Sequence, residues 1–312
     1  MPILVTFALL YVLLRNVDSV ALASSIRSAV RSPWCWVALA LSITSHIGLS
    51  AMKWGEILSG LGARQPLSLL VYLESATDIL IRVVPLRAGE LLKIWHLASR
   101  RGVPAFITTS SIALDAATNL GALIVLAASG FVAQRGESTI MGIGVALALS
   151  ACAVVSARAI LRGVAKLFAP RETPAEGFRA KCSEYIVRAS GFPVVSMART
   201  GILSVVIEFS EIAVVAMLCR ATAVDVPFTT LFALWPIASI LGGLPISVGG
   251  AGVRDGAFLA LLLPMGTATY EQALAVGLTF MLVGVLIPCL VGFPFTAQLI
   301  STMTTPIRRL DR

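Results

Sequence analysis

The sequence predicts an all-α polytopic membrane protein with about six full transmembrane helices and two re-entrant helical hairpins. Hydrophobic residues make up 57% of the 312-residue chain, charged residues make up only 13%, and the mean hydropathy is +0.92. Water-soluble domains carry about 25% charged residues. We therefore expect residues 1–312 to form a single transmembrane domain.

The charges and cysteines exclude several other classes of protein. The formal net charge of +8 would suit a nucleic-acid partner, but the basic residues lie between apolar segments without aromatic interleaving. Loop arginines that set membrane topology explain them better. The five cysteines show no metal-ligand spacing, and two histidines with no nucleophile motif or P-loop leave little for catalysis. We expect no nucleic acid, no metal, no cofactor and no enzymatic activity.

The first helix is expected at the apolar run Ile3–Leu14. A cleaved signal peptide would carry a basic residue before this run, and none is present, while Arg15 and Asp18 interrupt the approach to a cleavage site. We therefore predict an uncleaved helix. A short amphipathic helix carrying Arg27 and Arg31 is expected to follow it at the membrane interface.

The second helix is expected at Trp34–Met52, where His46 is the only titratable residue. Lys53 and Trp54 come directly after it. Lysine and tryptophan are enriched at membrane–water interfaces, so this pair is interpreted as an interfacial anchor.

The remaining full crossings are expected at 107–131, 138–157, 200–219 and from 272 to about 292. Pro288 can kink the last of these, and a looser tail is expected to reach Ile307. Residues 158–199 contain eight basic residues and three prolines. They are expected to form the main cytoplasmic connection.

Two other apolar stretches, Leu67–Arg101 and Val226–Tyr270, are broken by prolines and glycines. Both share a Pro-x-x-x-Gly spacing, at Pro85 in the first and Pro245 in the second. Each half, of about 15 residues, would reach only about 22 Å, short of a hydrocarbon core of about 30 Å. Broken backbone at that depth must be buried in protein or line a wet cavity. We therefore expect two re-entrant hairpins.

The matched positions of the hairpins predict an inverted-topology repeat. Residues 34–131 form the first unit, residues 200–300 form the second, and the helix at 138–157 links them. A single crossing between the units inverts the second, as in secondary transporters. Loop charges place the C-terminus in the cytoplasm, and the N-terminus joins it there if residues 67–101 are re-entrant rather than fully crossing.

Intramembrane charges supply the candidate site. Glu74, Asp78 and Arg82 fall on one helix face, where Asp78 can pair with Arg82. Asp115 and Asn119 form another pair on one face. Glu208 and Glu211, one turn apart, could accept a cationic headgroup or a proton, or could lie near an interface.

Further charges follow the glycine turns of the hairpins, where helix N-termini and free N–H groups favour anions such as a phosphodiester. The glycines are expected to supply positive φ angles. The alternative is that these charges only hold helices together. The predicted headgroup-binding residues are Arg87, Glu90, Lys93, Arg254, Asp255, Gly249, Gly250 and Gly252.

Two sequence blocks carry a family resemblance. The run Pro-Leu-Arg-Ala-Gly-Glu at 85–90 resembles the P-x-R-x-G-E block of the lysylphosphatidylglycerol synthase transmembrane-region family. The run at 244–256 is similar to that family's L-P-x-S-x-G-G-x-G-x-R-E-G block. Asp78 stands where the family usually has Asn, which could alter headgroup charge preference. Asp255 stands where it usually has Glu, which keeps the carboxylate on a shorter arm.

The resemblance implies a stand-alone lipid translocator in the bacterial inner membrane. Its substrate would be an anionic or zwitterionic phospholipid, or a polyprenyl or hopanoid-type lipid, with the headgroup held between the hairpins. Two rival functions remain open. One is a transporter of small anions, and the other is a non-transporting scaffold for a lipid-modifying synthase or glycosyltransferase. The candidate partners are a membrane lipid, such an enzyme, and a second copy of the chain.

Overall fold

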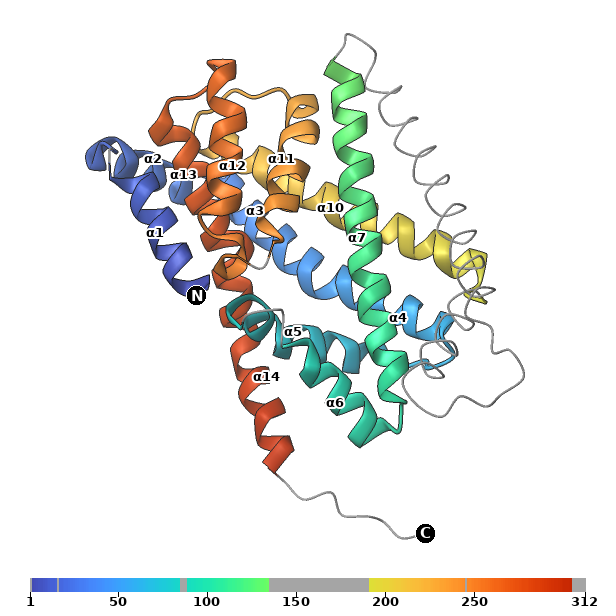
Figure 1. The fold of residues 1–312 in the computed structure, drawn as a ribbon. Coiled ribbons are helices and arrows are strands. Elements are labelled where there is room, and N and C mark those ends of the chain that lie inside the picture. Colours follow the sequence, from blue (N-terminus) through green and yellow to red (C-terminus); the bar gives the residue numbers. More distant parts are fainter. Residues whose placement is uncertain (1, 16, 85–88, 135–190, 245, 305–312) are drawn as a thin grey trace, which may run out of the picture.

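The computed structural model describes residues 2–15, 17–84, 89–134, 191–244 and 246–304, and each regular element in these ranges is a helix (Figure 1). Five helices are long and apolar enough to cross a membrane, and the α1–α2 pair makes six if it counts as one bent span. This confirms the predicted all-α polytopic class. The linking helix expected at 138–157, and the 158–190 part of the basic connection, lie outside the described residues.

The N-terminal segment forms two helices, as predicted. They are α1 (Pro2–Leu14) and α2 (Ser19–Arg31). Asp18 begins α2, because its Oδ1 accepts the Val20 N–H at 2.9 Å and so satisfies one of the free donors of the first turn. α1 packs against α12 and α2 packs against α13.

The first long helix is longer than the sequence predicted. α3 (Pro33–Ile43), the π-helical turn η1 (Thr44–Leu49) and α4 (Ser50–Gly60) form one continuous helix of 28 residues. Lys53 and Trp54 therefore lie inside it, and both are buried. The interfacial-anchor interpretation was wrong. Since α4 packs along the next long helix, Lys53 finds an acidic partner inside the protein rather than a headgroup at its surface.

The first broken segment is a pair of short helices followed by a long one. They are α5 (Leu67–Val83), α6 (Glu90–Arg101) and α7 (Ala105–Gln134). Trp54, six residues before the end of α4, donates from Nε1 to Oγ of Ser111, six residues after the start of α7, at 2.9 Å. α7 therefore begins on the side of the molecule where α4 ends.

The second broken segment also contains a pair of short helices, which follow a long one. It comprises α10 (Val194–Ala221), α11 (Phe228–Gly242), the 3₁₀ turn η3 (Val248–Gly250), α12 (Val253–Leu262) and the 3₁₀ turn η4 (Leu263–Met265). Residues 248–265 are long enough to count as a span. Positive φ angles of 58°, 80° and 79° at Gly249, Gly250 and Gly252 interrupt them, however, as predicted. The α-helical part that remains is about 15 Å long.

The last helix is continuous where a looser tail was predicted. α13 (Tyr270–Phe280), the π-helical turn η5 (Met281–Leu286) and α14 (Ile287–Thr304) run on through Pro294. The π-turn stands just before Pro288, where a proline removes a donor and displaces the carbonyl four residues earlier. The tail expected after Gly292 was wrong because α14 packs along α5. Thr296 Oγ1 donates to the Ala76 carbonyl at 2.7 Å.

Helices from the first half of the chain pack against helices from the second half. α3–α4 packs on α10, while α5 packs on α14 and α11 packs on α7. In Figure 1, α5 and α6 lie toward the end of the molecule where α14 finishes, and α11 and α12 lie toward the opposite end. Glycines permit both close contacts. A Cβ at Gly130 of α7 would meet the Ala233 backbone, and a Cβ at Gly292 of α14 would meet the Ser75 carbonyl.

A larger side chain at either glycine should destabilise the packing of the helix pair that the glycine joins. Gly130→Val and Gly292→Val should each cost about 1–3 kcal/mol, since a branched side chain would be forced against backbone that cannot rotate away. Gly121→Val, on α7 with no atom within 4 Å of its added Cβ, is the matched control. Thermal unfolding in detergent measures the effect. Equal midpoints for Gly130→Val and Gly121→Val would contradict this account of the packing.

Candidate functional site

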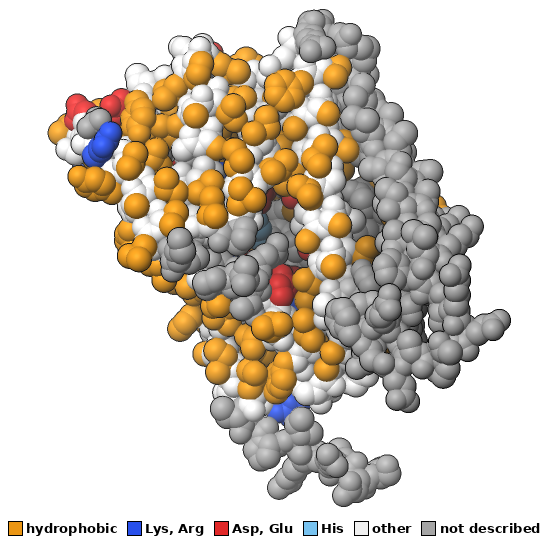
Figure 2. All heavy atoms as spheres, viewed as in Figure 1, with side chains coloured by type: hydrophobic (Ala, Val, Ile, Leu, Met, Phe, Trp, Pro, Cys, Tyr) orange, Lys and Arg blue, Asp and Glu red, His pale blue; other side chains and the backbone are white. Residues whose placement is uncertain are grey.

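A polar cavity of about 540 Å³ lies where the two short-helix pairs meet. Figure 2 shows acidic and histidine side chains inside a hollow on a face where apolar side chains are prominent. The cavity is bordered by α5, α6, α11, η3 and α12 and by the long helices α4, α7 and α10. Its charged and histidine residues are His46, Glu74, Asp78, Arg82, Glu90, Lys93, Asp115, Glu208, Glu211 and Arg254.

The cavity brings together most of the predicted site residues. Gly249, Gly250 and Asn119 also line it. Two described residues of the predicted site, Gly252 and Asp255, are not among those that line it. Arg87 lies outside the described residues. The tips of the pairs touch here, because a Cβ on Gly249 would stand 3.8 Å from Arg82 Cβ.

One ion cluster joins α5 to α6. Lys93 Nζ lies 2.9 Å from Glu74 Oε2 and 3.0 Å from Glu90 Oε2. It also stands 5.0 Å from the Trp54 ring centroid, which adds a cation–π contact. Two carboxylates share one ammonium here. Lys93 is therefore already neutralised and is a poor candidate for the principal phosphate ligand.

A second cluster crosses the cavity from α5 to α11. Asp78 Oδ1 accepts from Arg82 Nε at 2.9 Å, which confirms the predicted pair. Arg82 Nη2 lies 3.5 Å from His46 Nδ1, and His46 Nε2 lies 3.4 Å from Glu211 Oε1. Trp235 Nε1 then donates to Glu211 Oε2 at 3.4 Å. A continuous series of polar contacts thus runs from α5 to α11.

A third cluster ties α4 to α7. Lys53 Nζ lies 2.8 Å from Asp115 Oδ1 and donates to Asn119 Oδ1 at 2.6 Å. The predicted pairing of Asp115 with Asn119 on one face is confirmed, and Lys53 is what they share. Asp115 therefore gives the cavity wall a carboxylate whose charge is balanced by Lys53 behind it.

Arg254 is the cation with the least complete set of partners in this cavity. Its guanidinium carbon lies 4.4 Å from the Phe280 ring centroid and 5.5 Å from that of Trp235. The residue is 7% exposed, and its ion pair with Asp255 Oδ1 is long, at 3.6 Å. Nε and Nη2 have no hydrogen-bond partner among the described residues. Aromatic contacts thus fix a planar guanidinium whose Nε and Nη2 are buried without a hydrogen-bond acceptor among the described residues.

Asp255 has a different role from the one its sequence position suggested. It is fully buried, and its Oδ2 accepts the Gly252 N–H at 3.0 Å. This carboxylate therefore occupies the N-terminus of α12, where an external anion would otherwise bind. Asp255 holds the glycine turn in place and faces Arg254 from behind.

Glu208 is the acidic counterpart of Arg254. It lies on α10, one helical turn before Glu211, and is 7% exposed. It has no hydrogen bond or ion pair with any described residue. A carboxyl group in this position is costly to bury unless it binds a ligand or a proton.

Among the described residues, no group of three or more His, Cys, Asp or Glu side chains could hold a metal ion.

Sequence reasoning missed the contribution of the first long helix. His46 and Ser50 line the cavity, and Lys53 stands behind its acidic wall. Their spacing of four and then three residues puts all three on one face of a helix. That periodicity could have identified them, had Lys53 not been read as part of an interfacial pair.

The chain was compared with known proteins. The family model described as "Lysylphosphatidylglycerol synthase TM region" matches residues 1–292. No curated protein is significantly similar to the chain in sequence. The match covers both hairpins, the cavity and all five long apolar helices up to residue 292.

Proposed function

We propose that this chain, which belongs to the lysylphosphatidylglycerol synthase TM region family, translocates a phospholipid across a bacterial inner membrane. The chain is a multi-pass membrane protein, and its family links it to lipid or membrane processes. In the proposal, the headgroup enters the cavity between the α5–α6 and α11–α12 hairpins. The acyl chains stay in the bilayer.

The observation that carries this proposal is the unpaired charge inside the cavity. Arg254 has N–H donors, at Nε and Nη2, that form no hydrogen bond with any described residue. Glu208 lines the same cavity and has no hydrogen-bond or ion-pair partner among the described residues. A phosphate would complete the first and an amine would complete the second. The remaining charges already pair with each other, so they shape the cavity and add little attraction.

The balance of charge favours a zwitterionic headgroup over a purely anionic one. Six carboxyl groups line the cavity against the three cations Arg82, Lys93 and Arg254. Lys53 compensates only Asp115. A headgroup that carries an amine as well as a phosphate would meet this acidic excess without repulsion.

We further propose that both hairpins are re-entrant and that the two units are inverted. At the first hairpin, the contact between Trp54 and Ser111 supports an equal level for the end of α4 and the start of α7. At the second hairpin, Ser28 Oγ donates to the carbonyl of Ala221, so that α10 ends beside α2. α2 also packs on α13, and α10 is in contact with α13 as well. In this proposal each hairpin starts and finishes at one level, and the loop charges then favour a cytoplasmic C-terminus and, with it, a cytoplasmic N-terminus.

Cysteine labelling tests this topology. On a background without native thiols, Arg64→Cys and Arg101→Cys, at the two ends of the first hairpin, should react with a membrane-impermeant maleimide from the same side. Asp225→Cys and Met265→Cys, at the ends of the second hairpin, should react from the opposite side. Labelling of positions 64 and 101 from opposite sides would mean that the first hairpin crosses the membrane.

Two rival functions make different predictions. A small-anion transporter would need an enclosed aqueous pathway, whereas a lipid translocator needs a cavity that opens toward the acyl chains. The hollow in Figure 2 lies on a face where apolar side chains are prominent, which supports the second. A scaffold for a lipid-modifying enzyme would tolerate loss of the cavity charges. The lipid assay below separates all three functions.

The direct test uses proteoliposomes that contain phosphatidylethanolamine with a fluorescent acyl chain. Dithionite bleaches only the outer leaflet, so the protein should raise the bleached fraction above the roughly one half of empty vesicles. Sulfate flux, measured in parallel, should remain at the background of empty vesicles. Anion flux without lipid movement would favour the small-anion transporter, and neither activity would favour the scaffold.

A further inference from the structure

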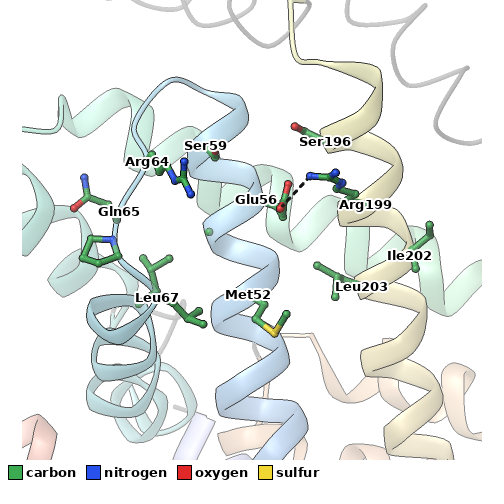
Figure 3. Close-up of a pocket in the computed structure, with 13 residues that line it drawn as sticks. Met52, Glu56, Ser59, Arg64, Gln65, Leu67, Ser196, Arg199, Ile202 and Leu203 are labelled. Atoms are coloured by element: carbon green, nitrogen blue, oxygen red, sulfur yellow. Dashed lines mark ion pairs between the residues drawn. The ribbon is translucent and has the colours of Figure 1, made fainter.

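A second hollow of about 720 Å³ lies beside α4, away from the central cavity. α4, the start of α5 with the loop before it, and the start of α10 form its walls (Figure 3). We call it the lateral groove. α4 presents Met52 and Glu56 to the groove, whereas it presents Ser50 to the central cavity. The proposed headgroup site does not use the lateral groove.

The lateral groove is polar at one end and apolar at the other. Figure 3 shows Arg64 and Arg199 near its polar end, and Met52, Leu67 and Ile202 toward its apolar end. These three apolar side chains are exposed, and Ile202 is the most so, at 61%. An apolar surface of this kind favours contact with a lipid acyl chain over contact with water.

The polar end carries a net positive charge. Arg64 is exposed and forms no ion pair or hydrogen bond with any described residue. Arg199 Nη1 lies 3.7 Å from Glu56 Oε1, a long contact for a side chain that is 64% exposed. Two arginines thus face one carboxylate, which leaves donors for an anion at this end of the lateral groove.

The depth of the lateral groove matches the membrane boundary. The 28-residue helix from Pro33 to Gly60 is about 42 Å long, so it exceeds a hydrocarbon core of about 30 Å by roughly 6 Å at each end. Glu56 stands four residues before the end of that helix and therefore lies near the boundary. Met52, one turn deeper, faces hydrocarbon. For a helix centred on the hydrocarbon core and perpendicular to the bilayer, the two arginines would lie at the level of lipid headgroups.

We propose that the lateral groove binds an anionic phospholipid from the adjacent leaflet. Its phosphate would lie between Arg64 and Arg199, and one acyl chain would run along Met52, Leu67 and Ile202. Arginine forks suit phosphate oxygens, and the apolar wall is long enough to select a lipid over a free phosphate. Such a lipid would join the first hairpin to α4 and α10.

Native mass spectrometry of the detergent-solubilised full chain tests this site. Phosphatidylglycerol should bind the wild-type protein more tightly than phosphatidylcholine of the same chain length. Arg64→Gln with Arg199→Gln should weaken phosphatidylglycerol binding about tenfold, since it removes two charge-assisted contacts. Arg27→Gln with Arg31→Gln, on α2, removes the same charge from another part of the surface and should leave the affinity unchanged.

A second variant tests the apolar part of the groove without touching its charge. Ile202→Trp should fill the lateral groove and weaken phosphatidylglycerol binding about as much, although both arginines remain. Equal affinity for the two lipids, or wild-type affinity in both groove variants, would overturn the proposal. So would an affinity lost in Arg254→Ala but kept in the groove variants, because the bound lipid would then occupy the central cavity.

Discussion

Arg254→Ala is expected to abolish lipid translocation while the protein stays folded and inserted. Its guanidinium is the cavity cation whose Nε and Nη2 lack hydrogen-bond partners among the described residues. Each lost charge-assisted bond to a phosphate is worth about 1.5–3 kcal/mol, or roughly tenfold to more than a hundredfold in rate. The fluorescent-lipid assay in proteoliposomes measures this loss.

Lysine should not restore activity at position 254. The guanidinium is held in plane by contacts at 4.4 Å with the Phe280 ring and 5.5 Å with the Trp235 ring. An ammonium cannot reproduce that planar fork. Arg220→Ala is the matched control, because Arg220 also stacks on a tryptophan, at 5.4 Å from the Trp34 ring, but is exposed outside the cavity.

Two outcomes at these positions would count against the headgroup site. Normal translocation by Arg254→Ala combined with Arg87→Ala would eliminate it. An equal loss in Arg220→Ala and Arg254→Ala would mean that arginine–tryptophan packing, and not the cavity, limits activity.

Gly250→Val should disable transport nearly as severely as loss of Arg254. Gly250 has a φ of 80°, and an added Cβ would lie 3.1 Å from the Gly242 carbonyl oxygen. A branched side chain disfavours that conformation and would push the hairpin tip out of the cavity. Initial lipid translocation rates, normalised to the amount of inserted protein, give the effect.

Gly62→Val provides a control for backbone strain alone. Gly62 has nearly the same φ, 81°, but an added Cβ there would meet no atom within 4 Å. If both variants lost transport equally, strain anywhere in the chain would explain the result. A large loss at Gly250 with a small one at Gly62 would show that the shape of the tip matters.

The sequence predicted the local features of the cavity better than the contacts between distant helices that form its walls. Asp78 and Arg82 are four residues apart on one helix, so their pairing follows from helical geometry alone. The positive φ angles at Gly249 and Gly250 follow from chemistry that only glycine tolerates. Both features depend on neighbours in the sequence.

The features that the sequence missed depend on contacts between distant helices. Lys53 resembles an interfacial anchor until Asp115, 62 positions away, is seen beside it. The helix continues beyond Gly292 because α14 packs along α5. The carboxylate of Asp255 accepts the Gly252 N–H and so is not exposed to a ligand. A single sequence does not reveal which side chains meet across such distances.

The central claim, that a lipid headgroup occupies the cavity between the two hairpins, can be tested by photo-crosslinking. A phosphatidylethanolamine analogue with a diazirine on its headgroup amine would be irradiated in proteoliposomes, and the labelled peptides would be mapped. The account predicts adducts on peptides of α5, α10 and the η3 turn, all reduced in Arg254→Ala. Adducts confined to the exposed ends of the long helices, and unchanged in Arg254→Ala, would contradict it.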